Sequence, residues 1–338
     1  MKLVTLIPAF KVQFLPSLLA ALEHQTVKAD AVLLSDDSPN ADFLRVLQAE
    51  PLAARCEKLK LEVVRGPCRG AHANVTHLVN LWAGRSERVH LLFDDDIVFP
   101  TFYERHLQAA AQSDCRVSVS LRWRSAEDGQ PLLRANAPEA VSTHPARLLA
   151  LPAPVLFATT IGAPTNWLGE FSNTVMHADL VPGITLPRLG DVPTVGLEDL
   201  GTFLRGSLDA PLALVNEHLG CFRSSAQQHS AQTMGTMMKL STCAWLPLAL
   251  ESRRRGLIDD AQVQRCAQFL GGLALKRYGA LPELAPLCGA LQAFRAGAPG
   301  AADRVQDEWL RYAVAMVPHA VAPELAARVA PAAEPAAA

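Results

Sequence analysis

Short apolar runs alternate with segments of helical spacing over the first 120 residues, and this alternation limits the folds open to the chain. Apolar runs bounded by turn residues predict buried strands, and leucines spaced by three and four predict amphipathic helices. A β-α-β-α-β order predicts a mostly parallel sheet flanked by helices, which is an α/β fold. The predicted strands are 3–7, 31–34, 61–64 and 89–93, and the predicted helices are 14–25, 42–47 and 73–82.

Two acidic clusters lie directly after predicted strands. Asp36 and Asp37 follow the second strand, and Asp94, Asp95 and Asp96 follow the fourth. Parallel sheets bind their ligands outside the carboxyl ends of the strands, so both clusters lie where a binding site is expected. This coincidence favours a functional site over the alternative, in which each cluster is a solvated turn.

The second cluster is three consecutive carboxylates, which repel one another and are costly to desolvate. A bound cation would offset that repulsion. Hard oxygen ligands suit Mg²⁺ or Mn²⁺, which bind through one or two carboxylates together with substrate phosphates. The triplet therefore points to an enzyme that handles a diphosphate.

Composition and charge narrow the classes of protein further. The 338 residues, half of them apolar, are enough for one large domain or two modest ones. A net charge of −2 gives no general affinity for nucleic acid. The seven cysteines are odd in number and form no C-x-x-C, which argues against disulfides and thiolate zinc sites and favours a cytosolic compartment.

Targeting and membrane segments are not expected. The first residues read as a strand and lack the features of a signal peptide. The most apolar internal stretch, 148–162, contains two prolines and is shorter than a membrane-spanning helix requires. We therefore predict no transmembrane segment.

The remaining two thirds of the chain are less regular. Residues 122–164 are rich in proline, which predicts loops, and residues 321–338, mainly Ala and Pro, predict a disordered tail. The predicted elements are strands at 117–121, 173–176 and 212–216, a helix at 198–205, and a helical region rich in Ala and Leu from 232 to 312.

The order of these features resembles that of a family 2 glycosyltransferase with the GT-A fold, of the non-processive bacterial type. The resemblance covers residues 1–220. It is carried by Pro8-Ala9-Phe10, Asp36-Asp37-Ser38, a helix start from Gly70 to Asn74, the Asp triplet, and Glu198-Asp199. No Q-x-x-R-W motif, which processive synthases of this kind carry, follows Glu198-Asp199. The resemblance implies a nucleotide-sugar-binding half (1–120), an acceptor-binding half (121–230), a helical carboxyl-terminal region (231–320) and the tail (321–338).

Two groups of residues are implied to bind the nucleoside. Asp36 and Asp37 would accept hydrogen bonds from the base and ribose, because ionised carboxylates accept from N–H and hydroxyl groups. Pro8 and Phe10 would line the base pocket. The alternatives are that the acids form an Asx-turn and that Pro8 ends its strand.

The helix start from Gly70 to Asn74 departs from the family pattern. The position that carries Arg in the family is Ala73 in this chain. Arg69 is the substitute for that basic contact, and Asn74 is the second donor-binding residue. The alternative is an ordinary helix start, for which a glycine followed by an asparagine is common.

The Asp triplet corresponds to the metal-binding D-x-D motif of the family. The resemblance implies that Asp94 and Asp95 contact the donor, and that Asp95, Asp96 and His218 hold Mn²⁺ or Mg²⁺ on its diphosphate. Alternation along an extended strand would instead pair Asp94 with Asp96, so the register of the ligands stays open. His229 is the alternative to His218, and either could be a structural histidine.

Glu198 and Asp199 correspond to the E-D pair of the family. Asp199 would be the general base that takes the proton of the acceptor hydroxyl, with Glu198 beside it. Acids are also common in the first turn of a helix because they complement its dipole, and this simpler reading stays open.

These features predict a metal-dependent, inverting glycosyltransferase that moves one sugar from a UDP-linked nucleotide-sugar to a hydroxyl. The acceptor would be a glycan, a lipid-linked molecule or a small molecule. The alternatives are a nucleotidyltransferase acting on a sugar phosphate and a non-catalytic nucleotide- or sugar-binding protein. We predict a cytoplasmic protein without a nucleic-acid partner; peripheral contact with the inner membrane and a homodimer stay open. Further candidates are Trp167 for sugar stacking, Asn173 near the acceptor and Arg223 for a phosphate.

Overall fold

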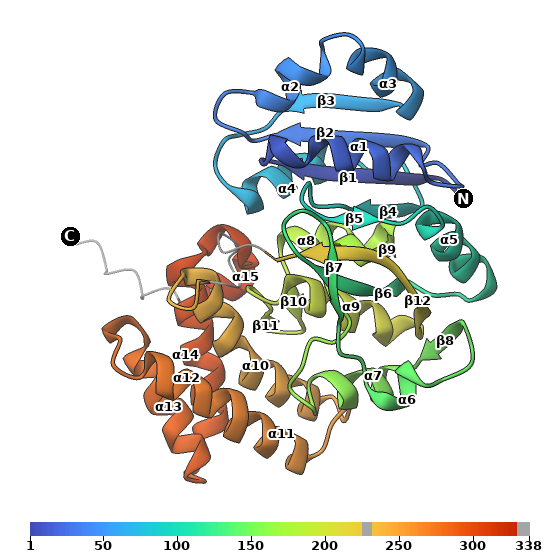
Figure 1. Ribbon diagram of the computed structural model, residues 1–338. Coiled ribbons are helices and arrows are strands. Elements are labelled where there is room, and N and C mark those ends of the chain that lie inside the picture. The colour runs from blue at the N-terminus through green and yellow to red at the C-terminus, as the bar shows by residue number, and fades with distance from the viewer. Residues whose placement is uncertain (225–231, 330–338) are drawn as a thin grey trace, which may run out of the picture. The chain divides into compact units, whose positions relative to one another are not determined.

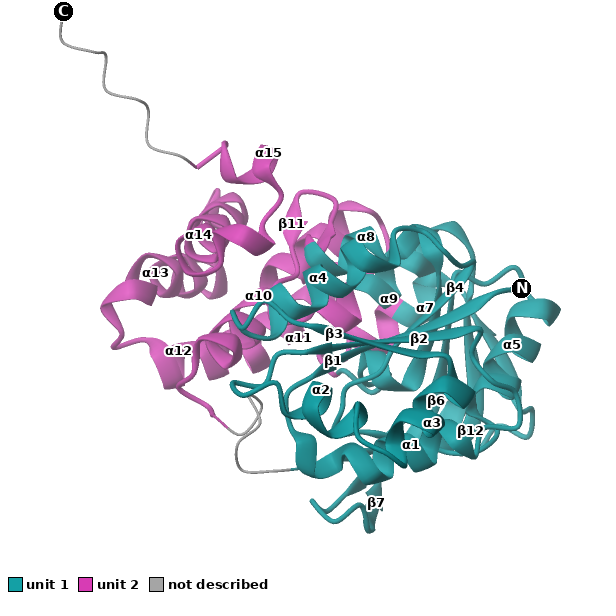
Figure 2. Ribbon diagram, turned by 90° about the horizontal axis from the view of Figure 1, so that it is seen from above, with its two compact units in different colours: residues 1–156, 166–185, 202–228 teal, residues 157–165, 186–201, 229–338 magenta. Residues whose placement is uncertain are grey.

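The computed structural model describes residues 1–224 and 232–329, and the chain divides into two compact units (Figures 1 and 2). Unit 1 comprises residues 1–156, 166–185 and 202–228, and unit 2 comprises residues 157–165, 186–201 and 229–338. Unit 2 therefore includes two stretches from the part of the chain predicted to bind the acceptor. Each unit is described by itself.

Unit 1 is built on one mixed sheet (Figure 1). Its strands in the described part of the chain are β1 (Leu3–Ala9), β2 (Ala31–Asp36), β3 (Leu61–Arg65), β4 (Arg88–Leu91), β5 (Ile97–Val98), β6 (Val117–Ser125), β7 (Pro131–Arg134), β8 (Leu148–Leu151), β9 (Thr174–His177) and β12 (Leu212–Arg223). Their order is β3-β2-β1-β4-β9-β6-β12-β5, with β7 beside β6 and β8 beside β12.

Most of the long strands of this sheet point the same way. β1 is parallel to both β2 and β4, β2 is parallel to β3, and β6 is parallel to β12. β9 is antiparallel to both β4 and β6, so β4 and β6 share one direction. The predicted α/β fold with a mostly parallel sheet is confirmed.

Helices cover both faces of the sheet in unit 1, with α4 and α8 on one face and α1 and α2 on the other (Figure 2). The helices of unit 1 are α1 (Leu15–Glu23), α2 (Asp42–Leu47), α3 (Leu52–Leu59), α4 (Ala71–Trp82), α5 (Phe102–Gln112), α6 (Glu139–Ser142) and α8 (Pro182–Thr185), with 3₁₀ turns at Val12–Phe14, Phe171–Asn173 and Ala178–Leu180. α7 (Ala153–Thr160) and α9 (Glu198–Asp209) contribute residues to both units.

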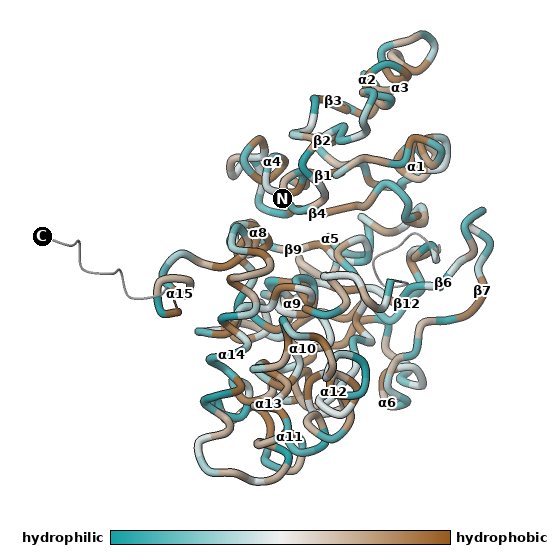
Figure 3. Tube along the Cα trace, turned by 90° about the vertical axis from the view of Figure 1, so that its left-hand side faces the viewer, coloured by the Kyte–Doolittle hydropathy of each residue, from teal (hydrophilic) through white to brown (hydrophobic). Residues whose placement is uncertain are grey.

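The first strand and helix show why the alternating pattern folds in this way. All seven residues of β1 are buried, as expected of a strand covered on both faces. In α1, Leu15, Leu18, Leu19 and Leu22 are buried, and the tube of this helix carries both hydrophobic and hydrophilic colours (Figure 3). The spacing of these leucines turns one stripe of the helix towards the core.

The prediction of loops for residues 122–164 is wrong in part. This stretch contains the end of β6, together with β7, α6, β8 and α7. β7 forms a hairpin with β6, which directly precedes it in the chain, and β8 pairs with β12, which lies about 60 residues further on. The ladder between β6 and β12 extends β12 to Arg223, beyond its predicted end at residue 216.

Unit 2 is mainly helical, as predicted for the region after residue 231. Its elements are β10 (Arg188–Leu189), β11 (Val192–Pro193), α10 (Thr236–Arg254), α11 (Asp260–Cys266), a π-helical turn (Ala267–Gly271), α12 (Gly272–Tyr278), α13 (Ala285–Arg295), α14 (Ala301–Met316) and α15 (Pro323–Ala326), with 3₁₀ turns at Pro282–Leu284 and Pro318–Ala320. Trp309 and Tyr278 are fully buried in its core.

The prediction of a disordered tail from residue 321 is wrong for residues 321–329. This segment includes α15, and the side chains of Val321 and Leu325 are buried. Glu324 also pairs with Arg188 at 2.5 Å. Residues 330–338 lie outside the described part of the chain. Within residues 1–224 and 232–329, no helix has the length and apolarity needed to cross a membrane.

Candidate active site

The carboxyl ends of β1, β2 and β4 lie at one edge of the sheet in unit 1. β2 and β3 are on one side of β1 and β4 is on the other, so the strand order reverses between β1 and β4. Open α/β sheets bind ligands at such a reversal, in the crevice outside the strand ends. The loops that begin at Phe10 and Phe93 flank this position.

Asp94 connects these two loops. Its Oδ2 atom accepts the main-chain N–H groups of Phe10 and Lys11, each over 2.6 Å. The side chain is buried, and burial raises the pKa of its carboxyl group to about 6, against the effect of the two N–H donors. Asp94 therefore fixes the main chain at the end of β1.

Asp95 carries a positively charged partner of its own. Its Oδ2 atom lies 2.5 Å from Nζ of Lys11, and the two side chains are 14% and 26% exposed. The main-chain carbonyl oxygen of Asp95 accepts from the guanidinium of Arg223 over 3.0 Å. The carboxylate of Asp95 is the most accessible of the three in the triplet.

Asp96 points towards β12 and the segment before β9. Its Oδ1 atom accepts the main-chain N–H of Arg223 over 3.2 Å, and Ser172 also hydrogen-bonds to its carboxylate. Burial, with the nearby charge of Asp95, raises the pKa of Asp96 well above its usual range. The triplet Asp94–Asp96 lies in a turn after β4, here called the Asp turn, rather than in an extended strand. Its three carboxylates therefore face three different sets of partners.

The residues of this turn fit a divalent cation only in part. No group of three His, Cys, Asp or Glu side chains placed to hold a metal occurs in the described ranges, so Asp95, Asp96 and His218 do not form the expected cluster. His218 instead packs against the ring of Trp123, with centroids 4.9 Å apart, and burial lowers its pKa. Two carboxylates suffice for Mg²⁺ or Mn²⁺ when phosphates complete the shell. The alternative ligand, His229, lies outside the described residues.

Asp36 is fully buried and has a structural role. Its Oδ1 atom accepts from the N–H and Oγ–H of Ser38 over 3.0 and 2.5 Å, and its Oδ2 atom accepts from the N–H of Leu44 over 3.0 Å. These bonds form the turn that leads into α2. The Asx-turn alternative therefore describes Asp36, because no oxygen of this side chain is left exposed for a ribose.

Asp37 follows Asp36 in the same loop, is 6% exposed, and holds the segment that precedes α4. Its carboxylate accepts the main-chain N–H groups of Cys68, over 2.5 Å, and Gly70, over 3.3 Å. A Cβ atom on Gly66 would lie 2.7 Å from Oδ1 of Asp37 and 3.0 Å from Oδ1 of Asn74. Only glycine permits this close approach, so the loop depends on residue 66 having no side chain.

The other predicted donor residues differ in exposure. Asn74 is buried, and its Nδ2–H donates to the carbonyl of Ser35 over 3.1 Å, while its Oδ1 atom has no described partner. Arg69 is exposed at the start of α4. Pro8 is buried within β1, but Phe10, two residues on, is 57% exposed beside Asp94. Phe10 thus offers an exposed aromatic ring at the edge of the sheet where β1 and β4 end.

Glu198 and Asp199 begin α9, as predicted, and here they belong to unit 2. Glu198 accepts the N–H of Gly196 over 2.7 Å, and burial raises its pKa. Oδ1 of Asp199 accepts the N–H of Leu200 over 2.6 Å. Gly196 has a φ of +85°, and a Cβ atom there would lie 2.4 Å from the N atom of Ser241 in α10. The helix start is therefore tightly fixed.

Several residues at this edge of unit 1 escaped the sequence analysis. Lys11 pairs with Asp95, and the buried Arg122 pairs with Glu170, their closest N–O distance being 2.5 Å. The signal for Lys11 was its place directly after the first strand. Arg122 and Glu170 carried no signal, because they are 48 residues apart and neither belongs to a motif.

Three of the further candidates are internal. Trp167 is 4% exposed and lies too deep to stack on a sugar. Asn173 is 4% exposed, and its Nδ2 atom donates to the carbonyls of Ser120 and Leu168 over 2.6 and 2.9 Å. Arg223 is 3% exposed and bound to the Asp turn, which explains its conformation without a phosphate.

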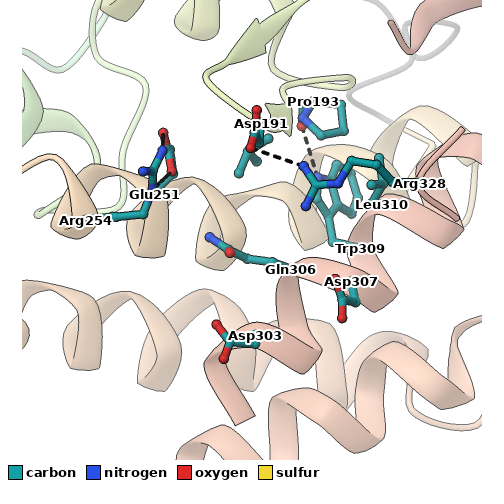
Figure 4. Close-up of a pocket in the computed structure, with 11 residues that line it drawn as sticks. Asp191, Pro193, Glu251, Arg254, Asp303, Gln306, Asp307, Trp309, Leu310 and Arg328 are labelled. Carbon is teal, nitrogen blue, oxygen red and sulfur yellow. Dashed lines mark hydrogen bonds and ion pairs between the residues drawn. The ribbon is translucent and has the colours of Figure 1, made fainter. Parts of the chain in front are cut away.

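A polar pocket of about 370 Å³ lies in unit 2, bounded by β11, α10 and α14 (Figure 4). None of the predicted site residues lines it. Its charged groups largely pair with one another, Asp191 with Arg328 at 3.1 Å and Glu251 with Arg254 at 2.7 Å. Its floor is held by Trp309, whose Nε1–H donates to the carbonyl of Pro193 over 3.0 Å.

The fold is similar to that of solved glycosyltransferase structures. S. aureus TarS, residues 1–349, in complex with UDP-GlcNAc is 12% identical over 94% of this chain and 93% of that chain, with a TM-score of 0.53. The same protein in complex with UDP is 14% identical over 92% and 91%, with a TM-score of 0.50. No family model matches the sequence, and no curated protein matches it. At these identities the likeness concerns the fold alone: the chain has an α/β fold with a mostly parallel sheet, similar to that of the TarS structures.

Proposed function

We propose that this chain is a glycosyltransferase that moves one sugar from a UDP-linked donor to an acceptor hydroxyl. The observation that carries the proposal is the junction of Asp94 with Phe10 and Lys11, which joins the β1 and β4 loops where the strand order reverses. It lies within a fold shared with TarS structures that hold UDP-GlcNAc and UDP. The proposal includes family 2 membership and transfer of a single sugar.

Each residue at this edge has a proposed part in holding the donor. Phe10 offers an exposed ring for the base, and Asp37 lies one strand away, where the ribose would be. Asp95 and Asp96 would hold Mn²⁺ or Mg²⁺, which when bound neutralises charge on the diphosphate. The carboxylates supply the hard oxygen atoms that such an ion prefers.

The reaction proposed at the acceptor hydroxyl is an inverting displacement at the anomeric carbon of the donor sugar. The acceptor hydroxyl attacks the anomeric carbon on the face opposite UDP. The bond between that carbon and the UDP oxygen breaks, UDP leaves with the electron pair, and the anomeric configuration inverts. Asp199 takes the proton of the hydroxyl as general base. Holding both substrates in place would supply much of the rate. The acceptor class, a homodimer and a cytoplasmic location beside the membrane remain predictions from the sequence.

A ligand panel followed by a transfer assay tests this function. We expect UDP to raise the melting temperature more than the other nucleoside diphosphates do, with a further rise in Mn²⁺, because a ligand of the native state stabilises it by mass action. Asp95→Asn and Asp96→Asn should lose the Mn²⁺-dependent part, whereas Asp114→Asn, an exposed control beyond α5, should keep it. A chain that no nucleoside diphosphate stabilises would disprove the proposal, and the anomeric configuration of the product would report inversion.

A further inference from the structure

We propose that Lys11 is a phosphate-binding residue of the donor site, and that its ammonium group moves from Asp95 to the diphosphate when the donor binds. This inference rests on the proposed function and deepens it. Lys11 is the second residue after β1, and its side chain meets Asp95 at 2.5 Å at the edge of the sheet where β1 and β4 end.

The main chain and the side chain of Lys11 are held in different ways. Its N–H donates to the buried carboxylate of Asp94 over 2.6 Å, so the backbone is fixed at the edge of the sheet. Its ammonium group meets Asp95 in a pair that is partly exposed on both sides. A partly solvated ion pair contributes little to stability, so exchanging Asp95 for a phosphate costs little.

The charge at this edge gives the exchange its driving force. A diphosphate that arrives beside three carboxylates is repelled unless a cation meets it. Two cationic side chains within residues 1–224 and 232–329 contact the Asp turn: the ammonium group of Lys11 and the guanidinium of Arg223.

Arg223 cannot make that move. Its guanidinium donates to the carbonyl of Asp95 and to Oγ of Ser17, each over 3.0 Å, and lies over the ring of Phe14 at 4.5 Å. With 3% of the residue exposed, it is enclosed on all sides. The side chain of Lys11 is partly exposed, and its four-carbon chain is flexible, so its ammonium group can change partners.

The exchange of partners by Lys11 also decides whether the carboxylate of Asp95 is available to a divalent cation. While Lys11 is paired with Asp95, a divalent cation competes with an ammonium group for the same carboxylate. Once the ammonium group binds a phosphate, the carboxylate of Asp95 is released. Removing the charge of Lys11 should therefore weaken binding of the diphosphate and strengthen binding of Mn²⁺ to the nucleotide-free protein, two effects of opposite sign.

Titration calorimetry on the full chain tests this with UDP, uridine and Mn²⁺ as separate probes. Lys11→Met keeps the length of the side chain and removes its charge. In EDTA we expect it to bind UDP at least tenfold more weakly than the wild type and uridine within twofold of it, because uridine has no phosphate. Mn²⁺ without nucleotide should bind Lys11→Met more tightly. Lys11→Arg should retain most of the UDP affinity.

Lys2→Met is the matched control, since Lys2 is exposed at the opposite end of the same strand. It should bind all three probes as the wild type does. Equal UDP affinity in Lys11→Met and wild type would overturn the inference, as would an equal loss of UDP and uridine. If Lys11→Met does not fold, Lys11→Gln repeats the comparison under the same criteria. A wild-type protein that binds neither UDP nor uridine, in EDTA or in Mn²⁺, would instead disprove the proposed function.

Discussion

The main-chain N–H of Arg223, the last residue of β12, donates to Oδ1 of Asp96 over 3.2 Å, across 127 positions of sequence. The guanidinium of Arg223 reaches the carbonyl of Asp95 and Oγ of Ser17 at the same time. One buried residue thus ties the end of the last strand to the Asp turn and to α1. The shape of the turn therefore depends on contacts with a strand that lies more than 120 positions away in the sequence.

Arg223→Met should destabilise unit 1 by about 2–4 kcal/mol, because two partly buried acceptors, at Asp95 and Ser17, lose their donor at about 1–2 kcal/mol each. Urea denaturation at pH 7 measures the loss. Arg253→Met is the control, since Arg253 forms an exposed pair with Asp260 and should cost less than about 1 kcal/mol. Equal losses in the two variants would contradict the assigned role of Arg223.

Gly169→Ala should destabilise the protein by more than the backbone strain of an alanine at positive φ, because its Cβ atom would also meet neighbouring side chains. Gly169 has a φ of +108°, and a Cβ atom there would lie 2.4 Å from Oδ1 of Asn173 and 2.6 Å from the guanidinium of Arg122. Gly84, with a φ of +75° and no atom within 4 Å of its Cβ position, isolates the backbone strain. We expect Gly84→Ala to cost about 1 kcal/mol and Gly169→Ala at least about 1–3 kcal/mol more. Comparable melting temperatures for the two variants would show that the contacts of Gly169 relax without cost.

Acid should destabilise the fold through its buried histidines. His90 is fully buried, and burial lowers its pKa to about 4 from the usual 6.5. Between those values the unfolded chain binds a proton that the folded chain does not. The free energy of unfolding therefore falls as the pH drops from 6.5 to 4, by up to about 1.4 kcal/mol per pH unit for this group.

Denaturant unfolding at pH 5 and pH 7 checks this for wild type, His90→Gln and His24→Gln. The difference between the two pH values should shrink in His90→Gln, which cannot take up that proton. It should stay unchanged in His24→Gln, because His24 is exposed. His106, whose pKa burial lowers to about 3, should keep some acid sensitivity in every variant. An unchanged difference in His90→Gln would exclude His90 as a source of the effect.

Asp199→Asn should reduce sugar transfer by about 10²- to 10⁴-fold while leaving UDP affinity within twofold, because a general base acts on the acceptor and not on the donor. Steady-state transfer assays and titration calorimetry measure the two quantities. Asp209→Asn, at the other end of α9, is the control and should keep full activity. Wild-type turnover in Asp199→Asn would remove Asp199 from the proposed mechanism, and Glu198→Gln would then be the next variant to assay.

Local pattern was enough to predict the fold class and the positions of many elements. Residues 42–47 were predicted as a helix and form α2, and β1 and β2 begin at the predicted residues. Such elements are visible in sequence because apolar spacing reflects which side chains face the core. The same reasoning placed both acid clusters at strand ends. It failed for β7, a short hairpin strand with four exposed residues, and for β8, whose partner β12 is distant in the sequence.

Only the tertiary structure decided what each acid does. Asp36 and Asp37 are neighbours in the sequence, yet one is sealed in a turn while the other holds the loop before α4. Asp94, Asp95 and Asp96 likewise have different partners. Asp94 accepts from the main chain directly after β1, Asp95 pairs with the ammonium group of Lys11, and Asp96 accepts from the end of β12. The sequence by itself determined that carboxylates would gather at one edge of a parallel sheet, because strand direction follows from the order of strands and helices. Their partners could not be determined from it, since hydrogen bonds across 80 to 130 positions depend on how the strands are arranged in space.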